Sequence, residues 1–479
     1  MAQFNNPQLR LLSVFSIIMI TVTSVDSIRN LPATALFGTP LIFFFIVGAI
    51  FFLIPAALVS AELAAAWPKR GGVYLWVKEA FGVKWGFLAI WFQWVENVVW
   101  YPTILSFFAG TIAYLINPHL ADNKYYLIGV ILVTYWVTTL INIRGLNTSA
   151  WVSVFCGIVG LLLPMGLIIL LGTIWILDGQ TLQISFAPHH WLPNFSDPTL
   201  LVSMTGVLLS YSGIEIATVH ARETRNPQRD FPRAMWISSL IIALTLILGS
   251  LAIAVVVPNA KLNLVSGIMQ AFSEFLSAYH LAWFIPCIAI LIALGTIGAI
   301  SNWTLAPIRG LLAAAQDGNL PPILQHENRF AAPTSLLWLQ AIIVTFIAGI
   351  FVLMPSINSS YWLLTAASAQ LYMVMYIIMF AAAIKLRYKH PTVKRPFIIP
   401  GGKAGIWFIA GLGFLTSIFT LIIGFFPPQG VNIGSLLRYE SFIIGLFLLM
   451  SIPPFIIYAL RKPHWKDVAV AKELLGTHL

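Results

Sequence analysis

Hydrophobic residues in this chain gather in long runs that short polar segments separate. Twelve runs can be drawn, at about 12–37, 40–66, 84–116, 125–143, 151–177, 199–221, 233–257, 281–314, 334–354, 360–386, 405–426 and 440–461. A helix needs about 20 mostly apolar residues to cross the hydrocarbon core of a bilayer, and the runs reach that length. The pattern therefore predicts an all-α polytopic membrane protein of about twelve transmembrane helices.

The distribution of basic residues predicts how these helices are oriented. With the N-terminus in the cytoplasm, 22 of the 26 lysines and arginines fall in cytoplasmic segments, three fall outside, and Arg29 lies within a span. Basic residues concentrate on the cytoplasmic side of membrane proteins, so we expect both termini there and the chain in the inner (plasma) membrane. Outside, the segment SGIMQAFSEFLSAY at 266–279 predicts a short amphipathic surface helix.

Composition argues against several other classes of protein. Apolar residues make up 59% of the 479 residues and charged residues only 9%, whereas soluble domains carry about 25% charged residues. The net charge of +10 is spread over short loops, so no nucleic acid partner is expected. The two cysteines lie in apolar runs, and Phe330 stands where a zinc motif starting at His326 needs a histidine. We therefore expect no metal and no cofactor.

The first apolar run contains a polar interruption. Between Thr23 and Pro32, seven of ten residues are polar, charged or proline, among them Asp26 and Arg29. Irregular backbone is tolerated at this depth only where it is buried in protein or lines a cavity. We therefore expect helix 1 to be discontinuous, with an unwound stretch near 24–29. Pro32 suits the first turn of the second half.

The sixth run has a matching interruption at Gly213 and Glu215, and Gly213 follows Asp26 by 187 positions. Spans 1 and 6 each open a group of five spans. Because an odd number of spans brings the chain to the other side of the membrane, the second group is inverted relative to the first. Paired interrupted helices in inverted halves indicate a transporter with its binding site at the membrane midplane. The sequence thus predicts one transmembrane domain over 1–461 and a short cytoplasmic tail at 462–479. Within the domain lie repeat one at about 12–177, repeat two at about 199–386, and two extra C-terminal helices at about 405–461.

Three segments around these interruptions resemble a known family. The run SYSGIEIATVHARETRNPQRDFPRA at 210–234 resembles the signature of the amino acid–polyamine–organocation (APC) superfamily, and AELAAAWPKRGGVYLWVKEAFG at 61–82 resembles its loop between spans 2 and 3. Together with SVDSIRNLP at 24–32, the resemblance is to bacterial glutamate/GABA antiporters and their sister permeases. It covers essentially the whole chain through span 12. It implies a LeuT-like five-plus-five inverted repeat and transport by alternating access.

The same resemblance implies roles for single residues. Glu215 matches the span-6 glutamate of the glutamate/GABA antiporters. Tyr372 and Tyr376 match two tyrosines along their path, and Trp303 matches a tryptophan of their site.

Departures from the family pattern leave the substrate open. Arg29 stands where an aromatic residue is expected, and Ala299 stands where a glutamate is expected. A longer C-terminal plug is also expected to be missing. Span 5, at 151–177, holds no lysine, so it lacks the proton-coupling lysine that the resemblance to some relatives would imply. This absence favours exchange over proton symport.

The residues themselves indicate that substrate binds between the two interruptions. Backbone N–H groups near 24–28 and 212–214 suit a carboxylate, and exposed carbonyls there suit an ammonium group. The candidate substrate-binding residues are Ser24, Val25, Asp26, Ser27, Ile28, Arg29, Tyr211, Ser212, Gly213, Glu215, Trp303, Tyr372 and Tyr376, with Glu62 and Glu96 as possible gate or cavity residues.

Alternatives stay open for the charged residues in the first interruption. Asp26 either binds an ammonium group or cation, or pairs with Arg29 one turn away and closes the break. Arg29 either binds a substrate carboxylate or gates the outer path, or it balances Asp26 and Glu215, since a buried charge needs a partner.

Two further carboxylates lie in spans 2 and 3. Glu96 either faces the cavity or makes a structural hydrogen bond to a neighbouring helix. Glu62, with Lys69 and Arg70 beyond it, is expected to belong to a cytoplasmic gate or fold contact.

These features predict a secondary active amino acid transporter that works as an exchanger. A transporter of cationic amino acids or polyamines on the same fold is the alternative, because two site carboxylates and one arginine leave a net charge of −1 when all are ionised. A non-transporting amino acid sensor is the alternative from another class. An enzyme is not expected, because the sequence lacks a nucleophile–base or metal constellation. The expected partners are an amino acid or amine substrate and the lipid bilayer.

Overall fold

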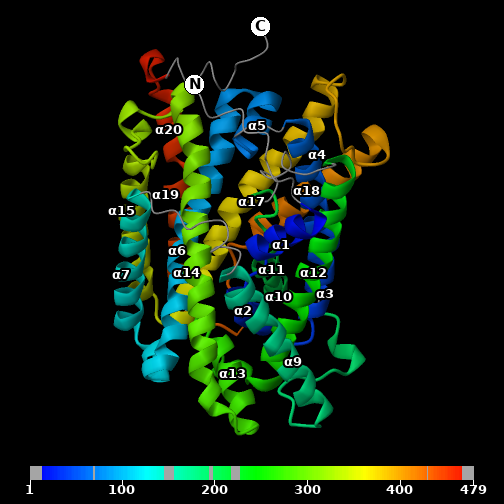
Figure 1. The fold of residues 1–479 in the computed structure, drawn as a ribbon, viewed down its shortest axis with the longest axis vertical. Helices are drawn as coiled ribbons and strands as arrows, with labels where there is room; N and C mark the ends of the chain where they lie inside the picture. Colours follow the sequence, from blue (N-terminus) through cyan, green and yellow to red (C-terminus); the bar gives the residue numbers. More distant parts are fainter. Residues whose placement is uncertain are drawn as a thin grey trace.

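The chain folds into a bundle of long helices (Figure 1). The computed structural model describes residues 13–67, 71–144, 156–193, 198–216, 227–428 and 430–466. In these ranges eleven helical segments are long and apolar enough to cross a membrane: Val14–Ala35, Leu41–Ala66, Val83–Ile116, Lys124–Ile143, Ile158–Leu177, Arg229–Val256, Ala282–Ile300, Thr334–Leu353, Ile357–Lys389, Gly402–Ile423 and Leu436–Ala459. The prediction of an all-helical, multi-pass membrane protein is confirmed.

The predicted sixth span, 199–221, is not among the eleven because its described part is interrupted. It consists of α10 (Pro198–Leu201) and α11 (Ser203–Tyr211), after which the chain turns through Ile216. Residues 217–221 lie outside the described residues. The predicted number of about twelve spans is therefore eleven in the part of the chain that the structure describes.

Most observed helices follow the predicted runs to within a few residues. In the first half they are α1 (Val14–Val25), α2 (Leu31–Ala35), α3 (Leu41–Gly48), α4 (Ile54–Ala66), α6 (Val83–Ile116), α7 (Lys124–Ile143) and α9 (Leu163–Leu177). In the second half they are α12 (Pro227–Val256), α14 (Ile285–Ala314), α15 (Thr334–Ala348), α16 (Ile350–Leu353), α17 (Ile357–Lys389), α18 (Gly402–Ile423), α19 (Leu436–Ser451) and α20 (Pro453–Ala459). Among these, α12 is already helical at Pro227, before the predicted start at 233, and it contains Pro232.

Two amphipathic helices lie at opposite ends of the bundle (Figure 1). One is α13 (Gly267–Ala278), which confirms the helix predicted at 266–279; its apolar face, including Phe272 and Phe275, is buried. The other is α5 (Val73–Phe81), in a stretch that the sequence reading treated as a loop. Tyr74, Trp76 and Val77 on its inner face are buried, so packing against the bundle stabilises a helix that is only nine residues long.

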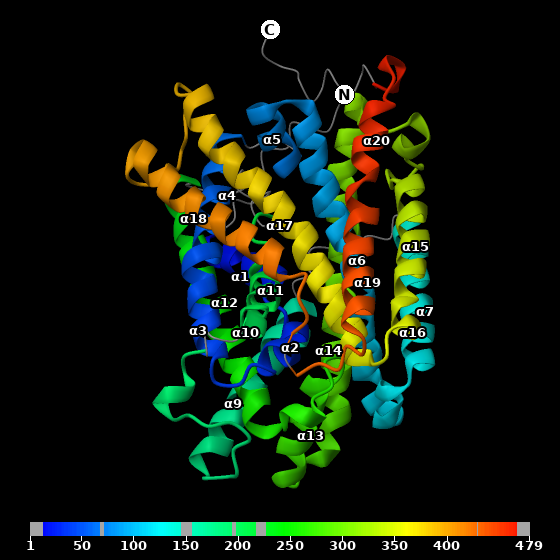
Figure 2. The ribbon, with the colours of Figure 1, turned by 180° about the vertical axis from the view of Figure 1, so that it is seen from behind.

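The centre of the bundle is formed by its two longest spans. α6 and α17 pack against each other, and 72% and 78% of their most apolar windows are buried. By contrast, α18 and the pair α19–α20 are only 28% and 22% buried, so these last spans lie at the periphery and present apolar side chains outward. Figure 2 shows α18 and α19 in front of α17 from the opposite side.

The first interruption is present and narrower than predicted. Ser24 and Val25 still belong to α1, so the expected unwinding from 24 is wrong. Asp26 and Ser27 adopt extended backbone angles, a 3₁₀ turn follows at Ile28–Asn30, and α2 then begins. Pro32 lies in the first turn of α2, as predicted. Figures 1 and 2 place α1 and α2 near mid-height of the bundle.

The second interruption lies at Ser212 and Gly213. α11 ends at Tyr211, Ser212 is extended with ψ 152°, and Gly213 has φ +103°. That φ lies in the left-handed region, which glycine adopts without the steric penalty of a Cβ atom. The sequence prediction that Gly213 breaks this span is confirmed.

A close contact between two glycines brings the fifth and eighth spans together beside the first interruption. Gly160 lies in a π-helical turn at Ile158–Leu162, and Gly295 lies in α14. A Cβ atom on Gly160 would lie 2.2 Å from the Cα of Gly295. Because small residues let helix backbones approach this closely, the two spans form a tight wall for the adjacent cavity.

Candidate functional site

A cavity of about 140 Å³ lies at the first interruption, between helices from both halves of the chain. A buried water molecule needs roughly 10–15 Å³ by this kind of measure, so the cavity has room for a solute as large as an amino acid. Its lining residues are Thr23, Val25, Asp26, Ser27, Ile28, Arg29, Asn30, Glu96, Asn97, Trp100, Ile104, Phe107, Gly157, Gly160, Leu161, Leu209, Ser212, Gly295, Thr296, Ala299, Trp303 and Tyr372.

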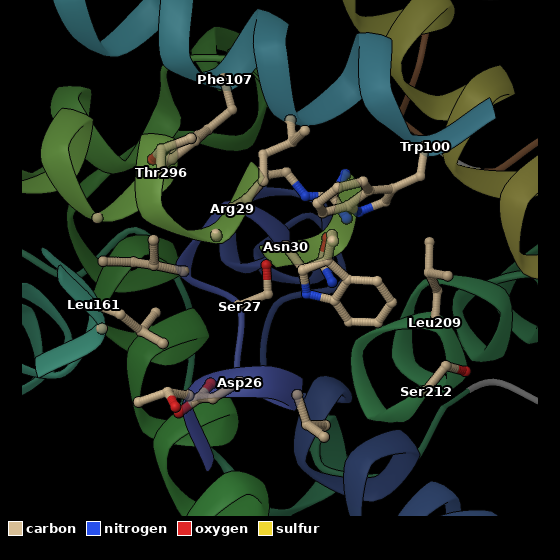
Figure 3. Close-up of a pocket in the computed structure, with 18 of the residues that line it drawn as sticks. Asp26, Ser27, Arg29, Asn30, Trp100, Phe107, Leu161, Leu209, Ser212 and Thr296 are labelled. Atoms are coloured by element: carbon tan, nitrogen blue, oxygen red, sulfur yellow. The ribbon is translucent and has the colours of Figure 1, made fainter. Parts of the chain in front are cut away.

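Asp26 forms one end of this cavity (Figure 3). Its backbone N–H completes the last turn of α1 by donating to the carbonyl of Val22 at 2.8 Å. One carboxylate oxygen, Oδ2, accepts from the Thr245 hydroxyl of α12 at 2.8 Å. The other, Oδ1, is buried without a hydrogen-bond partner among the described residues. Asp26 therefore has acceptor capacity left for a ligand.

Arg29 lies on the other side of Ser27 from Asp26 (Figure 3), and the structure does not pair the two charges. Of the alternatives left open for these two residues, their mutual ion pair is not formed in this conformation. The 3₁₀ turn that follows the extended residues directs the Arg29 side chain away from Asp26 and towards α6. There its guanidinium donates to the Thr103 hydroxyl.

Aromatic rings surround the Arg29 guanidinium. Its Cζ lies 5.3 Å from the centre of the Trp100 ring and 5.9 Å from that of Tyr361, distances at which a cation is attracted to a π face. The Tyr361 hydroxyl also donates to the Arg29 carbonyl at 3.1 Å. The Nε of Arg29 has no hydrogen-bond partner among the described residues. The side chain is thus held in place while part of its hydrogen-bonding capacity stays open.

Glu96 lines the cavity from α6, in agreement with one of the two roles proposed for it. It interacts electrostatically with Arg29, although the two do not approach within ion-pair distance, and its Oε2 is buried without a hydrogen-bond partner among the described residues. Trp100, Thr103 and Phe107 follow Glu96 at helical spacing and therefore share its face of α6.

Glu215 is buried next to the second interruption but does not line the cavity. Its carboxylate accepts from Gln93 at 2.9 Å, from the Tyr372 hydroxyl at 2.6 Å, and from the Tyr376 hydroxyl. Gly213 donates its backbone N–H to the Tyr376 hydroxyl at 2.8 Å. Glu215 therefore connects the broken sixth span to α6 and α17.

The other predicted residues divide between the cavity and its surroundings. Trp303 lines the cavity and packs against Trp100, with ring centres 5.8 Å apart. Ser212 lines it too, while its hydroxyl donates to the carbonyl of Leu208 at 2.8 Å. Tyr211 points elsewhere and donates to the Phe45 carbonyl at 3.0 Å.

The structure thus assembles most of the predicted site around one cavity. The predicted residues on its lining are Val25, Asp26, Ser27, Ile28, Arg29, Ser212, Trp303, Tyr372 and Glu96. Those that do not line it are Tyr211, Gly213, Glu215, Tyr376 and Glu62. The side chain of Ser24 lies outside the description.

Glu62 belongs to a separate ion-pair network at one end of α4. Its carboxylate pairs with Arg387 at 2.5 Å and with Arg395 at 3.5 Å, and it accepts from the backbone N–H of Ile399 at 2.9 Å. Burial lowers the pKa of the Arg395 guanidinium, and the charge of Glu62 counteracts that shift. The basic residues expected near Glu62, at positions 69 and 70, lie outside the described residues.

A second polar cluster, centred on Asp317, was not anticipated from the sequence. Asp317 accepts from the Tyr74 hydroxyl at 2.5 Å and from the Lys78 ammonium group, and Lys466 lies 3.9 Å away. Burial raises the pKa of the Tyr74 hydroxyl, and the negative charge of Asp317 raises it further. The cluster ties α5 to the end of α14 and to the segment that follows α20.

Sequence reasoning also missed several residues of the cavity. Asn30, Asn97, Trp100 and Thr296 line it and were not among the candidate substrate-binding residues. Trp100 is one helical turn after Glu96, so the spacing of four residues was a usable signal. The contribution of Thr296 depends on how α14 packs, which its sequence does not encode locally.

Comparisons with known proteins agree with this architecture. Residues 12–449 match the amino acid permease family. An uncharacterized transporter of Legionella pneumophila is 45% identical over 449 residues, which cover 94% of this chain and 97% of that protein. A glutamate/gamma-aminobutyrate antiporter of Lactococcus lactis is 32% identical over 464 residues, covering 95% and 92%. A probable agmatine/putrescine antiporter of the same species is 26% identical over 451 residues, covering 93% and 94%.

The superfamily resemblance inferred from the segments at 24–32, 61–82 and 210–234 is thereby confirmed, as is the expectation that the protein is not an enzyme. Because the family match spans most of its length, the chain belongs to the amino acid permease family of membrane transporters.

Proposed function

We propose that this protein is a secondary active amino acid transporter that works as an exchanger by alternating access. Substrate binds in the cavity between the interrupted parts of the first and sixth spans. The observation that carries the proposal is the convergence of Asp26, Arg29 and Ser212 on one buried, amino acid-sized cavity. Isolated carboxylate and guanidinium groups are costly at membrane depth, and they typically mark a substrate or ion pathway.

The broken backbone supports binding of a zwitterion. The carboxyl end of α1 leaves carbonyl groups without helical partners, and the start of the 3₁₀ turn and α2 leaves N–H groups without them. The helix dipoles place partial negative charge at the first of these ends and partial positive charge at the second. A substrate ammonium group is therefore favoured beside Asp26, and a carboxylate is favoured beside the N–H groups near Ile28.

The proposed architecture is the LeuT-like inverted repeat, with repeat one at about 12–177, repeat two at about 199–386, and two peripheral helices at about 405–461. The low burial of α18 and α19 supports a peripheral role for those last helices. We place both termini in the cytoplasm and the protein in the inner (plasma) membrane, on the distribution of basic residues. Exchange then follows from rocking of spans 1 and 6 with spans 2 and 7 against the rest.

Two substrate groups follow from the relatives, which are named as antiporters of glutamate and gamma-aminobutyrate or of agmatine and putrescine. Similarity to the first relative suggests that the substrate of this protein is an amino acid, and similarity to the second suggests a cationic amine. Amino acid exchange is favoured because Arg29 adds a fixed positive charge to the cavity. A sensor that binds amino acids without moving them is the alternative from another class.

Glu215 is proposed to hold the site together and to couple it to α17, because three donors fix its carboxylate. The test is counterflow in proteoliposomes loaded with unlabelled glutamate, gamma-aminobutyrate, arginine, leucine or putrescine. Wild-type protein is expected to accumulate labelled substrate only when a counter-substrate is inside. The Glu215→Ala variant is expected to be folded and inactive.

Glu274→Gln serves as the control, because Glu274 is exposed on α13. Full exchange by folded Glu215→Ala protein would remove Glu215 from the proposal. Saturable binding by wild-type protein without exchange of any of the five substrates would instead favour the sensor.

A further inference from the structure

We propose that Arg29 selects the charge of the substrate, so that the cavity takes zwitterions with a carboxylate and rejects diamines. This inference rests on the proposed exchange function and goes further by naming a substrate class and the residue that enforces it. It is based on the position of the Arg29 guanidinium, on the rings around it, and on the opposite pole formed by Asp26.

Arg29 lines the cavity and lies among aromatic rings. Its guanidinium lies beside the Trp100 and Tyr361 rings, with Cζ at 5.3 and 5.9 Å from their centres, and Trp303 packs against Trp100. Aromatic surroundings of this kind attract a cation, whether it belongs to the protein or to a ligand. Because Arg29 already fills this position, a positively charged end of a substrate has no place there.

Arg29 has hydrogen-bond donors that the described residues do not fully occupy. A guanidinium carries five N–H donors. The Arg29 guanidinium donates to the Thr103 hydroxyl and also interacts with the Tyr361 hydroxyl, and its Nε has no partner among the described residues. Arg29 as a whole is only 2% exposed. A buried guanidinium with open donors matches a carboxylate, which accepts two parallel hydrogen bonds from this fork.

The neighbouring Glu96 does not remove this preference. Glu96 interacts with Arg29 electrostatically, but the two are not within the 4.0 Å of an ion pair. Glu96 lowers the net charge near the guanidinium without occupying its donors. Arg29 is therefore stabilised in the membrane interior and still presents N–H groups to the cavity.

Asp26 supplies the negatively charged end of the cavity, opposite the positively charged Arg29. Asp26 lies across Ser27 from Arg29 (Figure 3), and its Oδ1 lacks a hydrogen-bond partner among the described residues. A zwitterion satisfies both poles, with its ammonium group towards Asp26 and its carboxylate towards Arg29. A diamine satisfies Asp26 but offers nothing to the open donors of Arg29, and its second ammonium group reaches the Glu96 carboxylate only beside that buried cation. Rejection by like charge is an effective source of specificity at low dielectric constant.

Gamma-aminobutyrate and putrescine test this inference directly, because both are four-carbon chains with an ammonium group at one end. They differ at the other end, which is a carboxylate in one and a second ammonium group in the other. Wild-type protein in proteoliposomes is expected to exchange gamma-aminobutyrate or glutamate, with putrescine failing to compete at a tenfold excess. In Arg29→Gln, the preference for gamma-aminobutyrate over putrescine is expected to fall by about tenfold or more, since a buried charge-assisted pair is lost.

Three further variants isolate the positive charge and its position. Arg29→Lys keeps the charge and is expected to keep the preference while lowering the exchange rate. Thr103→Val removes the hydroxyl that holds the guanidinium and is expected to give an intermediate preference. Arg438→Gln makes the same chemical change at an exposed position and is expected to match wild type. Ligand-induced thermal stabilisation in detergent measures the same preference for any variant that binds but does not exchange.

The outcomes separate this inference from the proposed function. Absence of exchange by wild-type protein for every substrate overturns the proposed function. Exchange by wild type with an unchanged substrate preference in Arg29→Gln overturns the role of Arg29 alone. Preference of wild type for putrescine overturns the substrate class while leaving exchange intact, and this comparison stands even when Arg29→Gln does not fold.

Discussion

The hydroxyl of Tyr376 accepts a hydrogen bond from the backbone N–H of Gly213 at 2.8 Å and donates to the Glu215 carboxylate. A single side chain of α17 thus satisfies both the backbone and the charge at the second interruption. An unpaired N–H group at this depth has no water to bind, so the contact stabilises the broken span.

Removing that hydroxyl is predicted to destabilise the protein. Tyr376→Phe leaves the N–H of Gly213 without its acceptor, and we expect a loss of about 1–3 kcal/mol in the free energy of unfolding. Tyr372→Phe is the matched control one turn earlier on α17, since it removes one side-chain donor to Glu215 and leaves the N–H of Gly213 paired. Thermal unfolding in detergent compares the two. Equal stability of Tyr376→Phe and Tyr372→Phe would contradict the bridging role.

Gly213 is predicted to be intolerant of a side chain. Its φ of +103° disfavours any L-residue, and an added Cβ would lie 3.0 Å from the Trp303 ring. We expect Gly213→Ala to cost about 1–3 kcal/mol in folding free energy and to abolish exchange. Gly206→Ala, in α11 of the same span, places its Cβ 3.5 Å from the nearest side chain and is expected to behave like wild type. Thermal unfolding and counterflow are measured for both variants. Wild-type stability and exchange in Gly213→Ala would contradict the prediction.

The Glu62 network is predicted to be a structural connection. The side chains of Glu62, Arg387 and Arg395 are 4%, 9% and 5% exposed, so removing the shared anion leaves two buried cations unbalanced. We expect Glu62→Gln to lower the free energy of unfolding by about 3–5 kcal/mol. Glu79→Gln is the control at a partly exposed carboxylate on α5. The prediction fails when both variants unfold at the wild-type temperature.

Tyr74 is predicted to make stability fall at high pH. Burial and the charge of Asp317 raise the pKa of its hydroxyl in the folded state. Above the ordinary tyrosine pKa of about 10, the unfolded chain releases this proton while the folded chain retains it, so stability decreases as the pH rises. The contribution is therefore fully present below about pH 10 and is lost above it.

The comparison with Tyr74→Phe isolates this effect from other tyrosines. Unfolding midpoints of wild type and variant are measured between about pH 8 and 11, a range that brackets the ordinary tyrosine pKa. We expect the wild-type midpoint to decline more steeply than that of Tyr74→Phe above pH 10. Parallel curves over the whole range would show that Tyr74 does not keep its proton in the folded state.

The spans and their interruptions were predictable from the sequence because both are consequences of local composition. A run of apolar residues crosses the bilayer wherever it occurs, and the polar residues around Asp26 and the glycine at position 213 disrupt a helix without reference to the rest of the fold. The family signature at 210–234 added the relationship to known permeases. The sequence also indicated that Asp26, Arg29 and Trp303 belong near one site.

The tertiary structure decided which partners these side chains have. The sequence left open whether Arg29 pairs with Asp26 three positions away or faces the substrate. In the structure it binds Thr103 and lies among aromatic rings of α6 and α17. Glu215 was expected in the substrate site, but three donors from α6 and α17 enclose it beside the cavity. Backbone hydrogen bonding within one span can be read from its own residues. The partner of a buried charge depends on how helices rotate and pack against each other, which only the folded chain determines.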